Sequence, residues 1–381
     1  DLLPIMLRDS ARIQEADAAY LNQKTNRRGL PPIIPLYTVE DAEAAIQLIQ
    51  PHKYTEELLL PGGIRLTHVD AGHILGAALA RLEIPRQGGP PLRVALTFDL
   101  GRKNLPLLHD PVQIRDVDIV ISESTYGDRD HLDARHEGED LRLAVNRALA
   151  RGGKVMIPTF ALGRAQEIIY LLAELREQNA IPDVPVYLDS PMAQAISRVF
   201  EFNLSYLDED YHDLRSRIGS VMTAPWLRYT ETVDESKAIT SSSEPSIVLA
   251  ASGMCEHGRI LHHLKHGIEN PANQVLLVGY QAVHTLGRRL QNKEPIVRIF
   301  GDEFEVRAEV ETLGSFSAHA DRNELFDYIQ GTGAKYVFLV HGEQSQREAF
   351  AARLRKRLGI PVELPNNGDI VDLAQLPIPS K

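Results

Sequence analysis

The 381-residue sequence contains one cysteine, no long apolar run and no low-complexity tract. Cys255 alone cannot form an internal disulfide or a cysteine-rich zinc site, so a bound metal would have to be held by carboxylates and by the 14 histidines. No stretch approaches the roughly 20 uninterrupted apolar residues of a membrane-spanning helix, and no secretory signal pattern opens the chain. We therefore expect a cytoplasmic protein that has no membrane partner.

The charge balance argues against one way of binding nucleic acid. Because 41 Lys and Arg stand against 52 Asp and Glu, the formal net charge is −11, which disfavours a protein that coats itself in nucleic acid through bulk charge. The total leaves room for a local positive groove. The apolar content of 43% is sufficient for buried cores, and the length predicts two or three domains.

The pattern of apolar residues changes along the chain and predicts two interleaved domains. Residues 1–49 have mostly helical spacing, and residues 58–98 form short apolar runs typical of successive strands. From residue 117 onward, predicted strands alternate with predicted helices, which indicates a parallel sheet with crossover connections. We predict an inserted domain at residues 131–295 and a host domain formed by residues 1–130 and 296–381.

Residues able to bind metal or move protons follow several predicted strands or precede a predicted helix. The five clusters are Asp70–His73, Asp99–Gly101, Ser122–Asp128, Ser315–Asp321 and His341–Glu343. One such cluster is more often an ordinary turn, but five of them predict a shared site, because strand ends direct loop side chains into one crevice. A pair of divalent metals needs imidazoles and a bridging carboxylate, and His73, Asp99 and His341 supply three such ligands.

Longer motifs carry a family resemblance that extends over nearly the whole chain. They are residues 71–77, 98–101, 123–127, 316–321 and 341–343, supported by residues 158–164, 188–193, 252–254 and 258–265. In these motifs the sequence resembles the metallo-β-lactamase-fold nucleases that carry a β-CASP domain. It is most similar to the bacterial and archaeal RNA-processing members, which are related to the endonuclease subunit of the cleavage and polyadenylation complex. The resemblance implies an α/β fold, in which a metallo-β-lactamase αββα sandwich carries an inserted β-CASP domain of the parallel-sheet type.

The resemblance also implies a role for each matching residue. His73 would bind a first zinc ion, Asp99 would bridge two, and His341 would bind the second. Glu123 and His319 match the carboxylate and histidine that distinguish β-CASP enzymes and lie near the scissile phosphate. The implied reaction is hydrolysis of single-stranded RNA by two Zn²⁺ ions and a bridging hydroxide, mainly endonucleolytic with exonuclease activity also allowed, leaving 5′-phosphate and 3′-hydroxyl ends. An imidazole that titrates near neutrality suits proton donation to a leaving oxygen, which agrees with this role for His319.

Two strand–loop–helix junctions in the inserted block could contact RNA phosphates. Free backbone N–H groups at each helix start would be reinforced by Arg164 or Arg259, and we also assign Ser252 and Ser317 to phosphate binding. The alternative is that the hydroxyls cap helices and the arginines cover their flanks. Three aromatic residues flank these segments and could stack on bases, although burial in the core is the default for each. They are Tyr126, Phe160 and Phe316.

The sequence departs from the family pattern in two places. The motif His-x-His-x-Asp-His, which donates four zinc ligands upstream of His73 in the family, does not occur around any of the 14 histidines. We expect it to precede Asp1, so that the chain as given is truncated at its N-terminus and holds little tightly bound dinuclear zinc. The second departure is Thr97-Phe98, where the family usually has Ser-Gly before the bridging aspartate.

Two alternatives to a ribonuclease remain open. The missing motif would also suit a non-catalytic RNA-binding or scaffold subunit, although such a subunit has no reason to keep His73, Asp99, His319 and His341. A β-CASP nuclease that cuts DNA is the nearest enzymatic alternative, but those members usually carry Val where His341 stands. The sequence leaves the RNA target and a homo-oligomeric state open.

Overall fold

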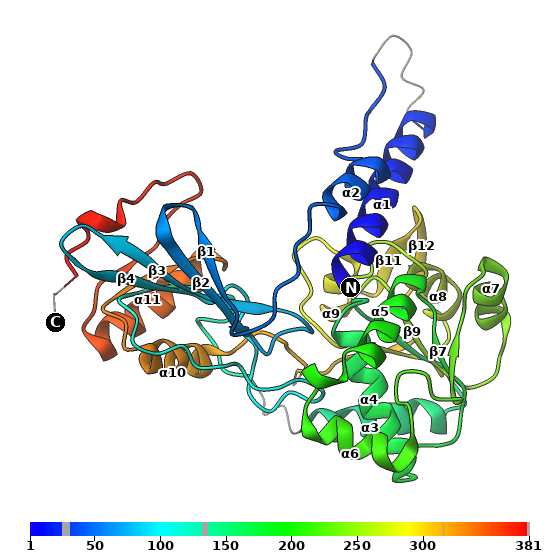
Figure 1. Ribbon diagram of the computed structural model, residues 1–381. Helices are drawn as coiled ribbons and strands as arrows, with labels where there is room; N and C mark the ends of the chain where they lie inside the picture. The colour runs from blue at the N-terminus through cyan, green and yellow to red at the C-terminus, as the bar shows by residue number, and fades with distance from the viewer. Residues whose placement is uncertain (25–30, 132–135, 315, 379–381) are drawn as a thin grey trace.

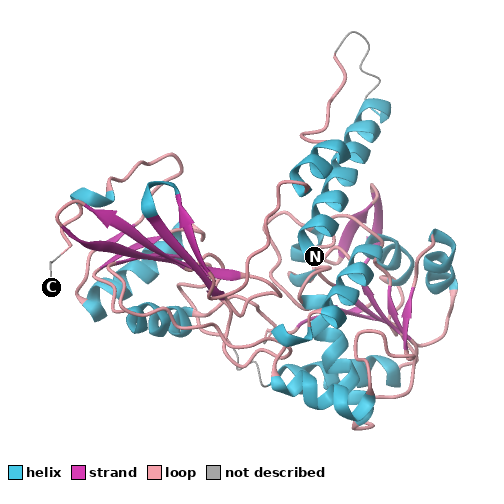
Figure 2. Ribbon diagram, in the orientation of Figure 1, coloured by secondary structure: helices cyan, strands magenta, loops and turns pink. Residues whose placement is uncertain are grey.

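The computed structural model describes residues 1–24, 31–131, 136–314 and 316–378. Figure 1 shows two lobes side by side, joined by loops that cross between them, with the first two helices rising above the second lobe. The first lobe is built on a seven-stranded sheet and the second on a six-stranded sheet. Figure 2 shows that helices gather around the second sheet, whereas strands dominate the first lobe.

The first lobe combines an antiparallel meander with parallel central strands. Its sheet has the order β1 (Glu57–Leu60), β2 (Ile64–Asp70), β3 (Ala78–Arg86), β4 (Gly89–Leu96), β5 (Ile119–Ser122), β14 (Tyr336–Leu339) and β15 (Val362–Glu363). Strands β1 to β4 pair antiparallel, and β4, β5, β14 and β15 pair parallel. Parallel pairing brings the carboxyl ends of β5 and β14 to one edge, where the predicted site residues follow.

Helices cover one face of this first sheet. Helices α10 (Arg322–Thr332) and α11 (Gln344–Leu358) bury Leu325, Phe350 and Leu354 against Val120 and Val337. A second cluster of buried side chains, Leu92, Val94, Ile119, Tyr336 and Phe338, packs against the segment around residues 373–378. Within the described residues, the first lobe therefore contains one of the two sheets expected in a sandwich.

The second lobe is a parallel sheet between helices. Its strand order is β13 (Glu309–Thr312), β10 (Gln274–Leu277), β6 (Val155–Pro158), β9 (Ile247–Ala250), β7 (Val186–Leu188) and β8 (Leu227–Tyr229). Every residue of β6, β9 and β10 is buried, as expected for parallel strands covered on both faces. The helices are α3 (Glu137–Ala150), α4 (Arg164–Glu177), α5 (Pro191–Phe202), α6 (Glu209–Ile218), α7 (Val233–Ser241), α8 (Ile260–Gly267) and α9 (Leu286–Gln291).

Strand pairing near residue 300 differs from the sequence prediction. The sequence predicts one strand of the host domain over residues 305–310, but β11 (Ile296–Ile299) and β12 (Asp302–Glu305) form a separate hairpin, and β13 pairs with β10. The cause is a tertiary contact: the N–H of Ala308, a buried residue, donates to the carbonyl of Ile268, which turns the chain away from the hairpin and toward the second sheet. The domain boundaries themselves stay predictions.

The N-terminal helices lie on the second lobe. Helix α1 (Leu2–Lys24) packs against α2 (Val39–Ile46) and α5, and Leu2 and Ile5 contact the core of that lobe. An ion pair joins α1 to α2, with Arg8 Nε 2.5 Å from Glu43 Oε1. Thr38 and Asp41 form a capping box that starts α2. In the described part of the chain, no helix is both long and apolar enough to cross a membrane.

Candidate active site

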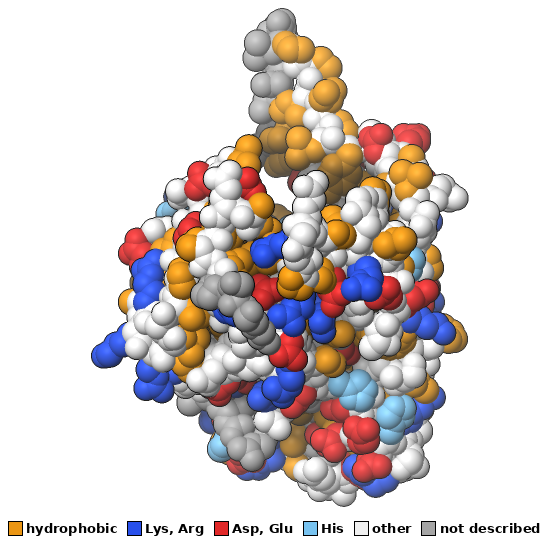
Figure 3. All heavy atoms as spheres, turned by 60° about the vertical axis from the view of Figure 1, so that its left-hand side comes forward, with side chains coloured by type: hydrophobic (Ala, Val, Ile, Leu, Met, Phe, Trp, Pro, Cys, Tyr) orange, Lys and Arg blue, Asp and Glu red, His pale blue; other side chains and the backbone are white. Residues whose placement is uncertain are grey.

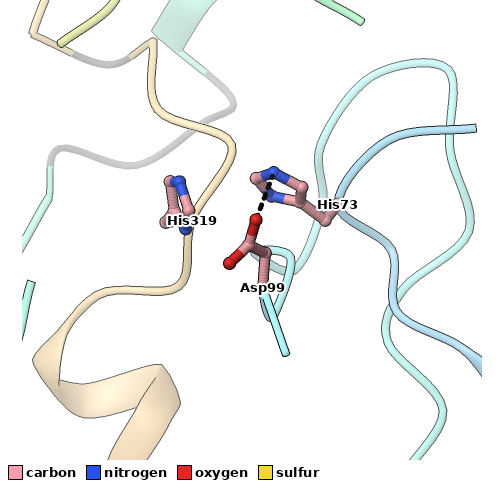
Figure 4. Close-up of side chains that lie close together, drawn as sticks. All are labelled: His73, Asp99 and His319. Atoms are coloured by element: carbon pink, nitrogen blue, oxygen red, sulfur yellow. Dashed lines mark ion pairs between the residues drawn. The ribbon is translucent and has the colours of Figure 1, made fainter. Parts of the chain in front are cut away.

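The predicted site residues meet between the two lobes, on loops of the first lobe. His73 follows β2, Asp99 follows β4, Glu123 follows β5, and His341 follows β14. His319 lies two residues before Asp321, which caps α10. Figure 4 shows His73, Asp99 and His319 converging from three separate loops. The structure thus brings together the five residues that the sequence assigned to metal binding and catalysis.

Asp99 lies between two histidines. Its Oδ2 is 3.9 Å from His73 Nε2, and its Oδ1 is 3.6 Å from His341 Nε2. The other ring nitrogen of His73, Nδ1, is 3.2 Å from the carbonyl oxygen of Ala318, so Nδ1 carries the proton and Nε2 presents its lone pair toward Asp99. Burial lowers the pKa of His73, and the neighbouring His319 lowers it further. His73 is therefore held in the neutral form that binds metals.

Glu123 orients His319. The carboxylate of Glu123 is fully buried and accepts the Leu100 N–H at 2.6 Å and the His319 Nδ1–H at 3.1 Å. This bond leaves His319 Nε2 facing the site. Burial alone would lower the pKa of His319, but the hydrogen bond and charge of Glu123, with a smaller contribution from Asp99, outweigh burial and raise it. A raised pKa increases the fraction of His319 that is protonated at neutral pH, as a general acid requires.

Gly101 lets the loops approach closely. A Cβ atom added to Gly101 would lie 2.0 Å from the carbonyl oxygen of Gly72, so only glycine fits between the Asp99 turn and the His73 loop. The Gly101 N–H donates to the carbonyl of Ala71 at 2.8 Å, and Gly101 also forms a bridge with His319. These contacts set the spacing of His73, Asp99 and His319.

The donor set suits a metal site. His73, Asp99 and His319 offer ligand atoms that all lie within 4.8 Å of one another, the one such group of three found among the described residues. Two ligand atoms on one tetrahedral zinc are roughly 3.4 Å apart, because each lies about 2.0–2.1 Å from the ion. The separations of 3.6 and 3.9 Å at Asp99 are close to that value. Each Asp99 oxygen faces one imidazole, so Asp99 could share a metal ligand set with either histidine.

Comparison with known proteins agrees with this geometry. Residues 165–290 match the family model for the Beta-Casp domain, and residues 303–365 match the model for the Zn-dependent metallo-hydrolase RNA specificity domain. A ribonuclease of Thermus thermophilus is 38% identical over 337 residues, which cover 88% of this chain and 75% of that protein. The chain belongs to the β-CASP metallo-β-lactamase ribonuclease family.

Other relatives in this family cover different shares of their own length. The RNase J-like protein of Methanocaldococcus jannaschii is 30% identical over 88% of this chain and 77% of that protein. Transcription termination factor FttA of Pyrococcus abyssi is 32% identical over 89% of this chain but only 53% of FttA. The chain thus spans about half the length of FttA. Family membership confirms the resemblance found in the sequence and the predicted fold, a metallo-β-lactamase fold with a β-CASP insertion.

The departure from the β-CASP pattern at Phe98 leaves the Asp99 turn in place. Phe98 adopts a left-handed backbone with φ 45°, a conformation that glycine takes freely and that costs an L residue roughly 1–2 kcal/mol. Its side chain is 55% exposed, so the larger residue creates no packing conflict at the site. Asp99 still faces both imidazoles.

The arginines predicted to bind phosphate already have carboxylate partners. Arg164 is buried, its Nη1 lies 2.5 Å from Glu167 Oε2, and its guanidinium stacks on Phe316. Arg259 Nη1 donates to Asp189 Oδ1 at 2.6 Å. An RNA phosphate would have to compete with these carboxylates. The assignment of both arginines to RNA binding stays a prediction.

The two predicted serines are also engaged within the protein. Ser252 Oγ accepts the Glu256 N–H at 3.1 Å within the loop before α8, which starts without a side-chain cap, so Ser252 is not the helix cap that the alternative expected. Ser317 Oγ donates to the His319 carbonyl at 3.4 Å. Both serines are buried. Ser317 shares a cavity wall with His319, so it remains the better placed of the two for substrate contact.

Sequence reasoning missed two buried polar networks. Asp189 is fully buried and accepts hydrogen bonds from His263, Ser236, Thr230 and Arg259. Burial raises its pKa, but these four donors outweigh burial and lower it. The second network joins Glu137, Glu167 and Arg164. The motifs around Asp189 and Arg164 were visible in the sequence, but nothing in a linear pattern shows that Asp189 meets His263 and Arg259, or that Glu137 lies against Glu167.

Proposed function

We propose that this protein is a zinc-dependent ribonuclease that hydrolyses phosphodiester bonds in single-stranded RNA. The observation that carries the proposal is the arrangement around Asp99, where two imidazoles face the two carboxylate oxygens and His319, fixed by Glu123, stands beside them. Membership of a ribonuclease family supports RNA as the substrate.

The residues divide the chemistry between them. His73, Asp99 and His341 would hold the metal, and we propose two zinc ions in a complete site. When bound, zinc supplies Lewis acidity and activates water for attack on phosphorus. The proton on His319 Nδ1 is held by Glu123, so the Nε2 position is free to carry a second proton and to donate it to the leaving oxygen. General acid assistance of this kind contributes roughly a hundred- to ten-thousand-fold in rate.

We also propose that the enzyme acts in RNA processing or decay, as an endonuclease with exonuclease activity also allowed, and that it is cytoplasmic. The single Cys255 is buried and cannot form an internal disulfide, which supports a cytoplasmic location. Figure 3 shows Lys and Arg side chains interspersed with Asp and Glu on the face that it presents, so bulk charge on this face does not favour RNA. The proposal leaves the homo-oligomeric state open.

The test compares matched RNA and DNA strands with the zinc-loaded complete gene product. We expect cleavage of single-stranded RNA, much weaker cleavage of DNA, and a loss of roughly a hundred-fold or more for His319→Ala. His266→Ala removes an exposed histidine of α8 and serves as the matched control, with full activity expected. Equal cleavage of both strands would favour the DNA nuclease, and no cleavage of either strand would favour the scaffold subunit.

A further inference from the structure

A cavity opens between the two lobes beside the catalytic histidines. Its volume is about 440 Å³, within the ~300–1,000 Å³ of ligand-binding pockets. His73 and His319 form part of its wall on the first lobe, and Phe160, Met254 and Tyr280 form part of its wall on the second. A ligand in this cavity would therefore touch the imidazoles of the site.

Phe160 contributes an aromatic ring to the wall of this cavity. Its ring lies directly on backbone, because a Cβ atom added to Gly253 would come within 2.9 Å of ring atoms Cδ2 and Cε2. Gly279 supports the same ring, with its added Cβ 3.7 Å from Cε2. Phe160 is nevertheless 42% exposed. The Cδ2–Cε2 edge of the ring is thus packed against two glycines, while a large part of the remaining ring surface is exposed to a ligand.

The other aromatic residues of the wall have different positions. Tyr126 and Phe316 are buried, as the default of packing in the core predicted. Tyr280 is 42% exposed, and its hydroxyl lies 3.3 Å from Glu343 Oε1, which ties the ring to the loop that carries His341. The Arg288 guanidinium lies over the Tyr280 ring at 5.8 Å. Phe160 and Tyr280 are therefore the two aromatic rings of the described wall that a ligand can reach.

The chemistry of the wall favours a neutral planar ligand. Most of the lining is apolar, including Met6, Ile74, Leu107, Leu162, Met192 and Ile196. Among the described lining residues, the one carboxylate is Glu167 and the one guanidinium is Arg164, and these two pair with each other. A phosphate would find no unpaired guanidinium among these residues, whereas a nucleobase would find aromatic and apolar surface.

We propose that Phe160 is a stacking platform for one unpaired nucleobase of the RNA, next to the phosphate that is cleaved. The inference rests on the proposed function, because RNA is the substrate that brings a base to His73 and His319. A base inside a duplex cannot reach the cavity, so the platform selects single-stranded RNA. Every base has a flat π-face, so stacking tolerates any sequence at this position.

The test measures binding in the absence of cleavage. The complete gene product is titrated with a series of short single-stranded RNAs in a buffer that contains a chelator. Each RNA in the series carries one abasic nucleotide, at a different position. We expect affinity to fall at one or two positions only, by about 5- to 140-fold, the fold-change that corresponds to stacking on one aromatic residue. In Phe160→Ala the profile becomes flat, and in Phe160→Trp the fall returns. Phe202→Ala, which removes an exposed phenyl ring outside the cavity, keeps the wild-type profile.

The two possible failures are distinguishable. A flat abasic profile for the wild-type protein, or an unchanged profile in Phe160→Ala, overturns the platform even if the zinc-loaded protein cleaves RNA. Loss of cleavage by the zinc-loaded protein overturns the proposed function, whatever the binding profile. If Phe160→Ala unfolds, Phe160→Leu with the same RNA series replaces it, because leucine fills the site but offers no aromatic face.

Discussion

Glu137 provides a prediction whose magnitude can be worked out. Its carboxyl is fully buried at the start of α3, and neither oxygen has a conventional donor in the described part of the structure. Burial, followed by the charge of Glu167 and a hydrogen bond to it, raises the pKa of Glu137 far above its usual range. A proton on Glu137 would let this carboxyl donate to Glu167, whose Oε2 lies 2.5 Å from Arg164 Nη1.

Keeping this proton has a cost that depends on pH. An unfolded glutamate has a pKa of about 4.3, so a carboxyl that stays protonated at pH 7 costs about 3.7 kcal/mol relative to acid pH. The folded protein binds the extra proton, so the contribution of Glu137 is fully present below about pH 4.3 and is lost as the pH rises toward the folded pKa. A glutamine side chain at this position would donate to Glu167 without this cost. However, its neutral amide would replace a hydrogen bond from the carboxyl to a charged group, and such a bond is worth roughly 1.5–3 kcal/mol. We expect Glu137→Gln to stabilise the protein by about 1–2 kcal/mol at pH 7, the difference between these two effects.

Urea unfolding at pH 5 and pH 8 measures this effect. The gain in unfolding free energy of Glu137→Gln over wild type should grow between the two pH values. Glu139→Gln is the matched control, since Glu139 is exposed on the same helix and pairs with Arg142. The reasoning is refuted if the gain does not grow with pH, or if Glu139→Gln shows the same increase.

Four further substitutions test the site and its support. Glu123→Gln should lower the rate of RNA cleavage by roughly 10- to 100-fold with little change in RNA affinity, because it loosens the orientation of His319. Gly101→Ala should lower RNA cleavage and zinc affinity together, because its Cβ would collide with the Gly72 carbonyl; chelator competition measures the zinc affinity. Gly89→Ala, where an added Cβ meets nothing within 4 Å, should change neither. Phe98→Gly should change the unfolding free energy by less than about 1 kcal/mol, since relief of the left-handed strain is offset by the entropy of glycine. Asp189→Asn should destabilise the second lobe by about 3 kcal/mol in urea unfolding, because four donors lose a buried charge.

Much of the fold followed from local patterns. Residues 1–49 have helical spacing, and α1 and α2 form there, with the capping box of Thr38 and Asp41 at the start of α2. The apolar runs before Asp99, Glu123 and His341 became strands of one sheet, since each run is short and buried. The clustering of site residues was predictable for the same reason, because parallel strands end at a common edge.

The rest depended on tertiary partners that no local pattern reveals. Residues 305–310 have the pattern of one strand, but the hydrogen bond from Ala308 to Ile268 divides them between two sheets. Arg164 has the position of a phosphate ligand in the sequence, yet its partner Glu167 lies on the same helix and both are buried. Phe160 could not be separated from Tyr126 by sequence, because its exposure depends on Gly253 and Gly279 beneath the ring.

The central claim is that the residues around Asp99 bind metal in order to cut RNA. The most direct measurement follows zinc content and RNA cleavage on the same samples of the complete gene product and of its Asp99→Ala variant. We predict zinc-dependent cleavage that leaves 5′-phosphate ends, with both zinc content and cleavage falling together in the variant. A wild-type protein that holds zinc but leaves RNA intact, or a variant that still cuts RNA at the wild-type rate, would contradict the account.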